Sequence, residues 1–296
     1  MKKNTFILLL LLFVVIITAS CSSKENTENT PQEKAIVQKT AVEIQREQDI
    51  VKLTEVLQRK PFNNTKNEAD LITQNILLNK EAFLHDLKIV LQKDKEMAAP
   101  DGNYEYASFL LRADKQVHLP DGYIPPNIVE LTKASGSMGN YMINRLDLSL
   151  RKPVEEALSR MATLAANDGI TLLVSSSYRS EEYQAIVFQR NVDNYGLEMA
   201  ERDSARPGTS QHQLGTVIDF GSITNDFYYT KAGEWMRENA PDLGWSLSFP
   251  QEYESVTGYV WESWHWRYIG VEAVKFQAKW FKDIQQYMIE FIHAWK

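Results

Sequence analysis

The spacing of apolar residues changes several times along the chain, and each change predicts a different kind of structure. Residues 6–17 form an unbroken apolar run, residues 22–34 are polar without periodicity, and apolar residues recur at helical spacing over 35–59 and 68–97. Residues 100–103, Pro-Asp-Gly-Asn, are typical of a turn and mark a boundary. The parts predicted are a leader (1–21), a flexible tether (22–34), an N-terminal helical region (35–98) and a main domain (99–296).

The leader has the composition of an export signal. Lys2 and Lys3 precede the apolar run, which is too short to span a bilayer, and two small residues precede Cys21. This arrangement resembles a bacterial lipoprotein signal, in which Cys21 is lipidated and becomes the mature N-terminus. An ordinary secretory signal with an incidental cysteine is the alternative. Either interpretation predicts an exported protein of the cell envelope, and the first predicts a membrane-anchored lipoprotein.

The main domain mixes short strand patterns with helical patterns. Helices are expected over 150–167, 181–191, 231–239 and 271–295, and strands over 170–175, 216–220, 246–249, 258–260 and 266–269. This mixed order favours an α+β fold, with a small, mostly antiparallel sheet and flanking helices. The last helix is rich in aromatic residues at helical spacing, which predicts core packing, with membrane or partner contact as the alternative.

Composition narrows the class of protein. The 296 residues are 44% hydrophobic and 24% charged, which is typical of a globular protein with a sizeable core. The formal net charge of −7 does not suggest a nucleic-acid partner. Cys21 is the only cysteine, so the remaining chain has no disulfides. Its stability must then come from core burial and from any bound metal.

Four side chains in two short segments carry the candidate chemistry. His212 and Asp219 lie seven residues apart, and Glu262 precedes His265 by three. Two imidazoles and one carboxylate around Zn²⁺ leave the fourth tetrahedral position for water. A free carboxylate beside that water can take its proton, so the set indicates a zinc hydrolase.

The spacing of Glu262 and His265 makes a structural demand. In a regular strand, residues three apart point to opposite faces. Both side chains can serve one site only where a bulge or turn intervenes, and we predict that irregularity at Ser263 and Trp264. Gly215 is expected to allow a tight turn between the first two ligands.

The order of these blocks resembles the VanY-like D-alanyl-D-alanine carboxypeptidases, zinc peptidases that trim peptidoglycan stem peptides. The resemblance is carried by Ser-x-His-x-x-Gly-x-x-x-Asp at 210–219 and Glu-x-Trp-His-Trp-Arg-Tyr at 262–268, and by blocks at 119–125 and 176–180 with Gln184. It covers roughly residues 105–285. It implies a zinc fold of the Hedgehog and DD-peptidase type.

The resemblance also implies roles. The zinc ligands would be His212, Asp219 and His265. Glu262 would be the general base, with zinc-bound water as the nucleophile. The substrate-binding residues would be Arg179 as a clamp for the terminal carboxylate, Gln184 and Ser210 as hydrogen-bonding partners of the peptide, and Trp264 as a wall of the pocket.

The chain departs from the family pattern in one place that bears on catalysis. Where the family usually has Arg-Tyr-Pro, this chain has Ser248, Phe249 and Pro250. A tyrosine hydroxyl there could donate to the oxyanion and Phe249 cannot, although Tyr253 or Tyr259 could substitute. Ser263, where the family commonly has proline, should loosen the turn slightly without removing a ligand.

These observations predict a zinc-dependent carboxypeptidase that removes a C-terminal D-alanine from peptidoglycan stem peptides. The residues do not decide between cleavage of a D-alanyl-D-alanine bond and cleavage of an L-residue to D-alanine bond. The alternative, kept open by Phe249, is a catalytically weak or inactive zinc-containing lipoprotein that binds cell-wall peptide.

Overall fold

The structure, a computed structural model, describes residues 31–62, 67–131 and 140–296. The predicted signal peptide, Cys21 and most of the predicted tether lie outside these residues. Glu47–Lys296 form one compact unit, and the described residues before Glu47 belong to a separate one. Helix α1 (Pro31–Gln58) runs through the boundary between them. Within the described ranges, no helix has the length and apolar character that a bilayer-spanning segment requires.

The helical stretch expected over 68–97 consists of two helices, α2 (Glu68–Leu78) and α3 (Lys80–Ala98). The break is at Asn79, whose φ of −125° and ψ of 35° leave the helical region. The Asn79 side chain donates to the carbonyl of Asn75 at 2.9 Å. Asparagine competes for backbone hydrogen bonds in this way, which explains a helix end that apolar spacing does not reveal.

The single C-terminal helix expected over 271–295 is also two helices, α11 (Val271–Trp280) and α12 (Gln285–Trp295), so that prediction was wrong in its continuity. Lys282 and Asp283 adopt left-handed backbone conformations, with φ of 53° and 60°. The amide of Gln277 donates to the carbonyl and to the carboxylate of Asp283, at 3.0 and 2.8 Å. These contacts stabilise the corner between the helices.

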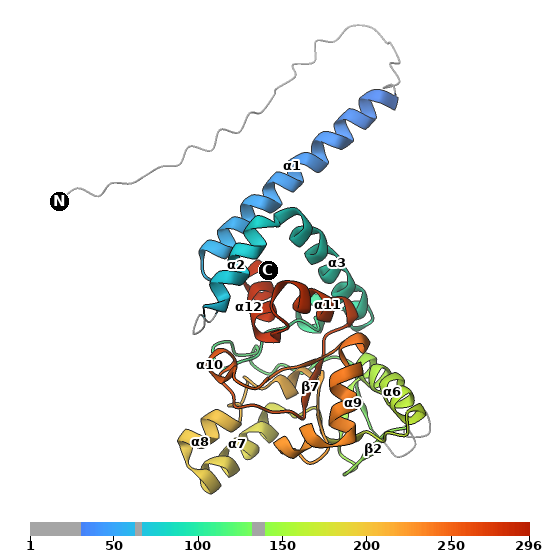
Figure 1. The fold of residues 1–296 in the computed structure, drawn as a ribbon, viewed down its shortest axis with the longest axis vertical. Helices are drawn as coiled ribbons and strands as arrows, with labels where there is room; N and C mark the ends of the chain where they lie inside the picture. Colours follow the sequence, from blue (N-terminus) through green and yellow to red (C-terminus); the bar gives the residue numbers. More distant parts are fainter. Residues whose placement is uncertain (1–30, 63–66, 132–139) are drawn as a thin grey trace, which may run out of the picture. The chain divides into compact units, whose positions relative to one another are not determined.

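The helices α2, α3, α11 and α12 share one apolar core (Figure 1). Phe83 is fully buried at its centre, with its ring centroid 5.0 Å from that of Phe291 and 5.2 Å from that of Phe276. The predicted core role of the C-terminal aromatic residues is confirmed for those buried here. The buried aromatic residues are Phe276, Trp280, Phe281 and Phe291, and Ile284, Met288 and Ile292 of the same stretch are buried with them. The domain boundary expected at residue 99 stays a prediction.

The central sheet is small and mostly antiparallel, which confirms the predicted α+β class. Its order is β2-β4-β5-β7-β6, and only the β2–β4 pair is parallel. The strands are β2 (Met142–Ile143), β4 (Leu173–Ser176), β5 (Val217–Phe220), β6 (Trp245–Leu247) and β7 (His265–Tyr268). A separate pair joins β1 (Ile128–Glu130) to β3 (Ser149–Arg151).

A strand was expected over 258–260, and the structure has none there. Helix α10 (Glu254–Thr257) instead ends at Gly258, whose φ of 81° terminates the helix in the left-handed region. The residues that follow are irregular and run along the candidate site. The other helical elements are η1 (Ala99–Asp101), α4 (Tyr104–Ala107), α6 (Lys152–Asn167), α7 (Glu181–Tyr195), α8 (Leu197–Asp203), η2 (Gln211–Leu214), η3 (Asn225–Tyr229), α9 (Lys231–Asn239) and η4 (Pro241–Leu243).

Helices α6 and α9 pack with the sheet in a second apolar core. Leu158 and Met161 of α6 and Met236 of α9 share this core with Ile218 and Phe220 of β5. Because side chains alternate along a strand, Asp219 lies between these two apolar residues and points to the other face of the sheet. The sheet thus buries its apolar face against helices and presents the candidate site on its opposite face.

Candidate active site

The first candidate ligand, His212, lies on η2, a short 3-10 helix with capped ends. The Ser210 hydroxyl accepts a hydrogen bond from the His212 backbone N–H at 3.2 Å, which fixes the start of the turn. Gly215 ends it with a φ of 67°. A Cβ at Gly215 would lie 2.9 Å from Cδ1 of Ile128 and 3.1 Å from Cγ of Arg151, so glycine is required for space as well as conformation. The expected tight turn between the first two ligands is confirmed.

Strand pairing brings the next two candidate ligands together. Strands β5 and β7 are antiparallel, and Asp219 lies directly opposite His265 in their register. Directly opposed residues have neighbouring Cβ atoms on the same face of a sheet. Pairing therefore places a carboxylate and an imidazole side by side from positions far apart in the sequence.

Glu262 reaches the same site because the chain turns just before β7. Residues 263 and 264 form a turn, and the His265 N–H donates to the carbonyl of Glu262 at 3.2 Å. The Glu262 N–H donates to the carbonyl of Phe249 at 3.0 Å, which holds the turn against the neighbouring segment. This is the irregularity predicted at Ser263 and Trp264, and it is confirmed.

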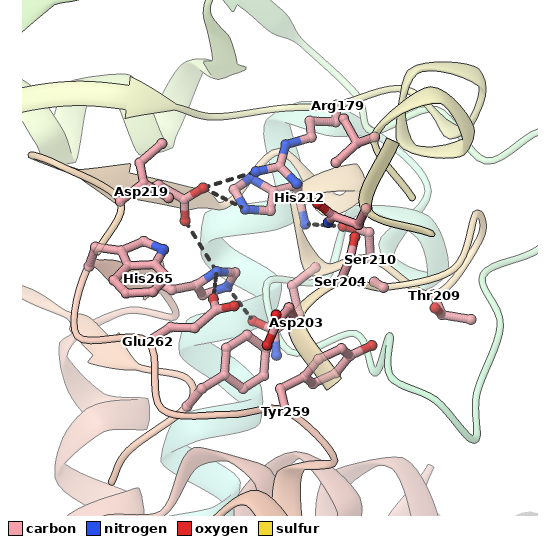
Figure 2. A pocket seen from close by; sticks show the side chains of 17 residues that line it. Arg179, Asp203, Ser204, Thr209, Ser210, His212, Asp219, Tyr259, Glu262 and His265 are labelled. Carbon is pink, nitrogen blue, oxygen red and sulfur yellow. Dashed lines mark hydrogen bonds and ion pairs between the residues drawn. The ribbon is translucent and has the colours of Figure 1, made fainter. Parts of the chain in front are cut away.

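The four side chains converge closely (Figure 2). Nε2 of His212 lies 3.2 Å from Oδ2 of Asp219, and Nδ1 of His265 lies 3.2 Å from Oδ1 of the same carboxylate. Oε2 of Glu262 is 3.1 Å from Nδ1 of His265. One donor atom each from His212, Asp219 and His265 lie within 4.8 Å of one another, and all three residues are buried. The structure thus assembles the predicted ligand set with the predicted base beside it.

Each imidazole has a hydrogen-bond partner on the side away from the cluster. Nδ1 of His212 is 2.6 Å from the carbonyl of Ser177, and Nε2 of His265 is 3.3 Å from Oε1 of Gln211. Since both partners offer an oxygen that only accepts, each of these ring nitrogens carries a proton. The nitrogens facing the cluster are then Nε2 of His212 and Nδ1 of His265. Sequence reasoning missed both partners.

Burial and neighbouring charges shift the pKa values of these groups. Burial and the charge of Arg179 lower the pKa of His212 to about 4, which keeps its imidazole neutral at pH 7. Burial also raises the pKa of Glu262, which its hydrogen bond to His265 only partly offsets. Burial alone would raise the pKa of Asp219, but the two histidines hold it well below its usual range. Burial alone would lower the pKa of His265, but hydrogen bonds to Asp219 and Glu262 raise it to about 9.

This arrangement fits a divalent cation of the zinc type. A neutral His212 directs the lone pair of Nε2 at Oδ2 of Asp219, and two acceptors 3.2 Å apart repel unless a cation lies between them. Nδ1 of His265 faces the carboxylates of Asp219 and Glu262, which favour a positive charge at this position. Two imidazoles and one carboxylate are the donor types of catalytic zinc sites, and both imidazoles have the outer hydrogen bonds that orient such ligands.

Arg179 lies at the edge of the cluster and is held in place by several acceptors. Its Nη2 donates to Oδ2 of Asp219 and to Oγ of Ser176, both at 2.9 Å, and its Nη1 donates to Oε1 of Gln184 at 3.2 Å. The Gln184 amide donates to the carbonyl of Ala205 at 2.8 Å. Gln184 is fully buried, and its amide is committed to these partners. The structure therefore places Gln184 against Arg179, and its expected contact with the peptide stays a prediction.

The cluster opens into a cavity of about 210 Å³. Of the predicted substrate-binding residues, Arg179, Ser210 and Trp264 line it and Gln184 does not. Figure 2 shows Asp203, Ser204 and Thr209 around the same cavity, all from the end of α8 and the loop that follows it. The other lining residues are Val187, Asn191, Ala205, Gln211, His212, Asp219, Ile223, Phe249, Tyr259, Glu262 and His265.

The position that lacks the family's tyrosine lies inside this cavity. The Phe249 ring packs on His265 with centroids 4.6 Å apart, and on Tyr259 at 4.8 Å. Tyr259 lines the cavity too, and in Figure 2 its hydroxyl points toward Thr209 rather than toward the histidines. The Tyr253 hydroxyl donates to Glu68 at 3.1 Å, and Tyr253 does not line the cavity. Of Tyr253 and Tyr259, the two residues suggested to replace the missing tyrosine hydroxyl, only Tyr259 therefore lies within the site.

Part of the chain is similar to known carboxypeptidases. Residues 147–271 match the family model described as VanY, D-alanyl-D-alanine carboxypeptidase. The putative carboxypeptidase YodJ of Bacillus subtilis (strain 168) is 32% identical over 174 residues, which cover 57% of this chain and 62% of that protein. The chain spans about half the length of the first curated relatives it matches, from 44% to 62%.

Two solved structures have a similar fold. The LdcB LD-carboxypeptidase is 27% identical with a TM-score of 0.54, and the match covers 63% of this chain and 86% of that one. The vancomycin-resistance D,D-pentapeptidase VanY in complex with Zn(II) is 24% identical with a TM-score of 0.50, covering 61% of this chain and 97% of that one. At 24% identity, the similarity to the VanY structure shows the fold alone.

Proposed function

We propose, because residues 147–271 match the family model of the VanY D-alanyl-D-alanine carboxypeptidases, that this chain is a zinc-dependent carboxypeptidase. Its substrate would be the peptidoglycan stem peptide, from which it removes a C-terminal D-alanine. The observation that carries the proposal is the convergence of His212, Asp219 and His265 with the Glu262 carboxylate at one end of a cavity.

The three convergent residues would hold the zinc ion. His212 through Nε2, His265 through Nδ1 and a carboxylate oxygen of Asp219 are the atoms that face one another. Zinc, when bound, supplies a Lewis acid that polarises a carbonyl group and makes water a better acid. The protein contributes a buried site whose ligands are already oriented, so little rearrangement is needed on binding.

Glu262 would move the proton. Its carboxylate takes a proton from the attacking water as the water oxygen bonds to the scissile carbonyl carbon. The same carboxyl group then gives that proton to the nitrogen of the departing D-alanine as the peptide C–N bond breaks. Its position in the turn before β7, 3.1 Å from a ligand nitrogen, keeps it next to the reacting atoms.

Arg179 would recognise the free carboxylate that distinguishes a C-terminal residue. Its guanidinium lines the cavity, and Ser176 and Gln184 hold it from behind. Nη1 has two N–H groups, and the hydrogen bond to Gln184 uses one of them, so the other can donate to a carboxylate beside the charge of the guanidinium. Ser210 and Trp264 line the same cavity and would contact the peptide, whereas Gln184 would act by positioning Arg179.

The experiment that tests this function is mass spectrometry of stem pentapeptide and tetrapeptide incubated with purified, zinc-loaded protein lacking residues 1–21. Loss of one D-alanine from the pentapeptide would assign cleavage of a D-alanyl-D-alanine bond, and loss from the tetrapeptide an L-residue to D-alanine bond. Glu262→Gln is the matched control, because it keeps the shape of the side chain and removes the base. Zinc binding without cleavage of either peptide would favour the binding lipoprotein that Phe249 keeps open.

We also propose that the protein is exported and anchored to the cell envelope by a lipid on Cys21. The support is the pattern of residues 1–21, which lie outside the described residues. Cys21→Ser should move the protein from the membrane fraction to the medium or the soluble fraction. Equal membrane retention of Cys21→Ser and wild type would contradict the anchor.

A further inference from the structure

Gln211 precedes one candidate histidine ligand in the chain, and its side chain contacts the other. It is next to His212 on η2, and its side chain is buried against the ring of His265. Oε1 of Gln211 is 3.3 Å from Nε2 of His265, the ring nitrogen that faces away from the cluster. Because an amide oxygen only accepts, this contact requires a proton on Nε2 and leaves Nδ1 free to face Asp219 and Glu262.

The amide oxygen of Gln211 is itself held in place by a serine. The Ser248 hydroxyl donates to Oε1 of Gln211 at 2.8 Å, and Oε1 of Gln285 lies 3.2 Å from the same hydroxyl. Gln285 is the first residue of α12, and its amide donates to the carbonyl of Ser246 on β6 at 3.4 Å. All these side chains are buried. The partner of His265 is therefore an uncharged, anchored amide.

We propose that Gln211 is a positioning residue of the metal centre, which fixes the proton of His265 on Nε2 and so selects Nδ1 as the ligand atom. This proposal rests on the proposed function, because it assumes that His265 is a zinc ligand. An outer partner orients the ring before the metal binds, and loss of such a partner typically weakens metal binding by about 10- to 100-fold. An amide also leaves the imidazole less basic than a carboxylate in its place would.

The test compares the zinc dissociation constants of three variants, measured by competition with a chelator. Gln211→Met keeps the length of the side chain and removes the acceptor, and we expect zinc binding about 10- to 100-fold weaker than in wild type. Gln211→Glu keeps an acceptor, and we expect binding at least as tight as in wild type. Gln213→Met is the matched control, because Gln213 is also buried on the same turn and donates instead to the carbonyl of Tyr123. Its zinc affinity should equal that of wild type.

Two outcomes would overturn the proposal. One is wild-type zinc affinity in Gln211→Met, and the other is equal weakening by Met and Glu, which indicates a purely structural role. If a variant does not fold, nitrogen-15 NMR of histidine-labelled wild-type protein with zinc decides. We expect a slowly exchanging proton on Nε2 of His265, and a proton on Nδ1 would overturn the assignment. Because none of these readouts uses turnover, they remain decisive even if neither stem peptide is cleaved.

Discussion

Helices α2 and α3 belong to the same compact unit as the segments η2, β5 and β7, but they bury a different kind of side chain. The buried residues of α2 and α3 are apolar except for Asp94. On η2 all four residues are buried, and three of them, Gln211, His212 and Gln213, are polar. Strands β5 and β7 add the buried candidate ligands Asp219 and His265.

The apolar helical core and the polar site therefore contribute differently, the first to the stability of the fold and the second to its proposed chemistry. Burial of apolar surface is favourable and does not depend on direction, so the helical core stabilises the fold with few geometric demands. Burial of imidazoles and carboxylates is costly unless each is paired, so the site depends on particular partners such as Ser177 and Arg179. We therefore expect substitutions in the helices to change the free energy of unfolding, and substitutions in the site to change zinc binding and turnover.

The largest effect is expected from His212→Ala in the site. Loss of a ligand should abolish stoichiometric zinc and reduce hydrolysis by at least about a thousandfold, because the metal provides several kcal/mol of transition-state stabilisation. Zinc content by atomic absorption and kcat/KM on the cleaved stem peptide measure it. His85→Ala, which removes an exposed histidine of α3, is the control. Full zinc content in His212→Ala would rule out the ligand set.

The next largest effect lies in the helical core. Phe83→Ala should lower the free energy of unfolding by about 3–5 kcal/mol, because it removes a fully buried ring that packs on four aromatic side chains. Denaturant titration measures the change, and Leu71→Ala at a half-exposed position of α2 is the control. The folded variant should keep wild-type zinc affinity. Weaker zinc binding in a folded Phe83→Ala protein would break the separation between the two regions.

Zinc itself should stabilise the site region to a smaller extent. At a free concentration of 100 times its Kd, zinc should raise the free energy of unfolding by about 2.7 kcal/mol, provided it does not bind the unfolded chain. Paired denaturation curves with zinc and with chelator give this number. Phe83→Ala should show the same increment as wild type and His212→Ala should show none. An increment in His212→Ala would indicate a second zinc site.

The smallest effect is expected at Phe249, where the chain departs from the pattern of the family that it resembles. Phe249→Tyr adds a hydroxyl to a ring that lines the cavity and packs on His265. If this hydroxyl reaches the oxyanion, kcat/KM should rise about tenfold, equal to about 1.4 kcal/mol, with little change in stability. Phe62→Tyr, on a buried ring of the helical core, is the control for a new hydroxyl away from the site. A lower rate in Phe249→Tyr would mean that the phenylalanine is adapted to its pocket.

Local patterns were sufficient for some features of the site. The turn at Ser263 and Trp264 followed from the three-residue spacing of Glu262 and His265, and the tight turn at Gly215 followed from a glycine between ligands. The helix breaks at Asn79 and at Lys282 and Asp283 escaped prediction, because apolar periodicity continues across them. The breaks depend on side-chain contacts to the backbone that periodicity does not record.

The contacts of Gln184 could not be predicted from the sequence. One helical turn beyond Ser180, Gln184 was expected to face the cleft and contact the substrate. In the structure its amide is turned to Arg179 and to the carbonyl of Ala205 in the loop after α8. Which groups an amide contacts depends on how that loop packs on α7, and no spacing within α7 reveals it.

The sequence by itself determined the residue types of the site, their order, the mixed α+β class and the turns within a few residues of each ligand. Those features follow from local backbone geometry and from the donor preferences of metals. The tertiary structure decided the register that sets Asp219 opposite His265, the contact between Gln211 and His265 across 54 residues, and the packing of α2 and α3 on the C-terminal helices. Such contacts join positions distant in the chain, so they depend on strand pairing and on the burial of whole elements together.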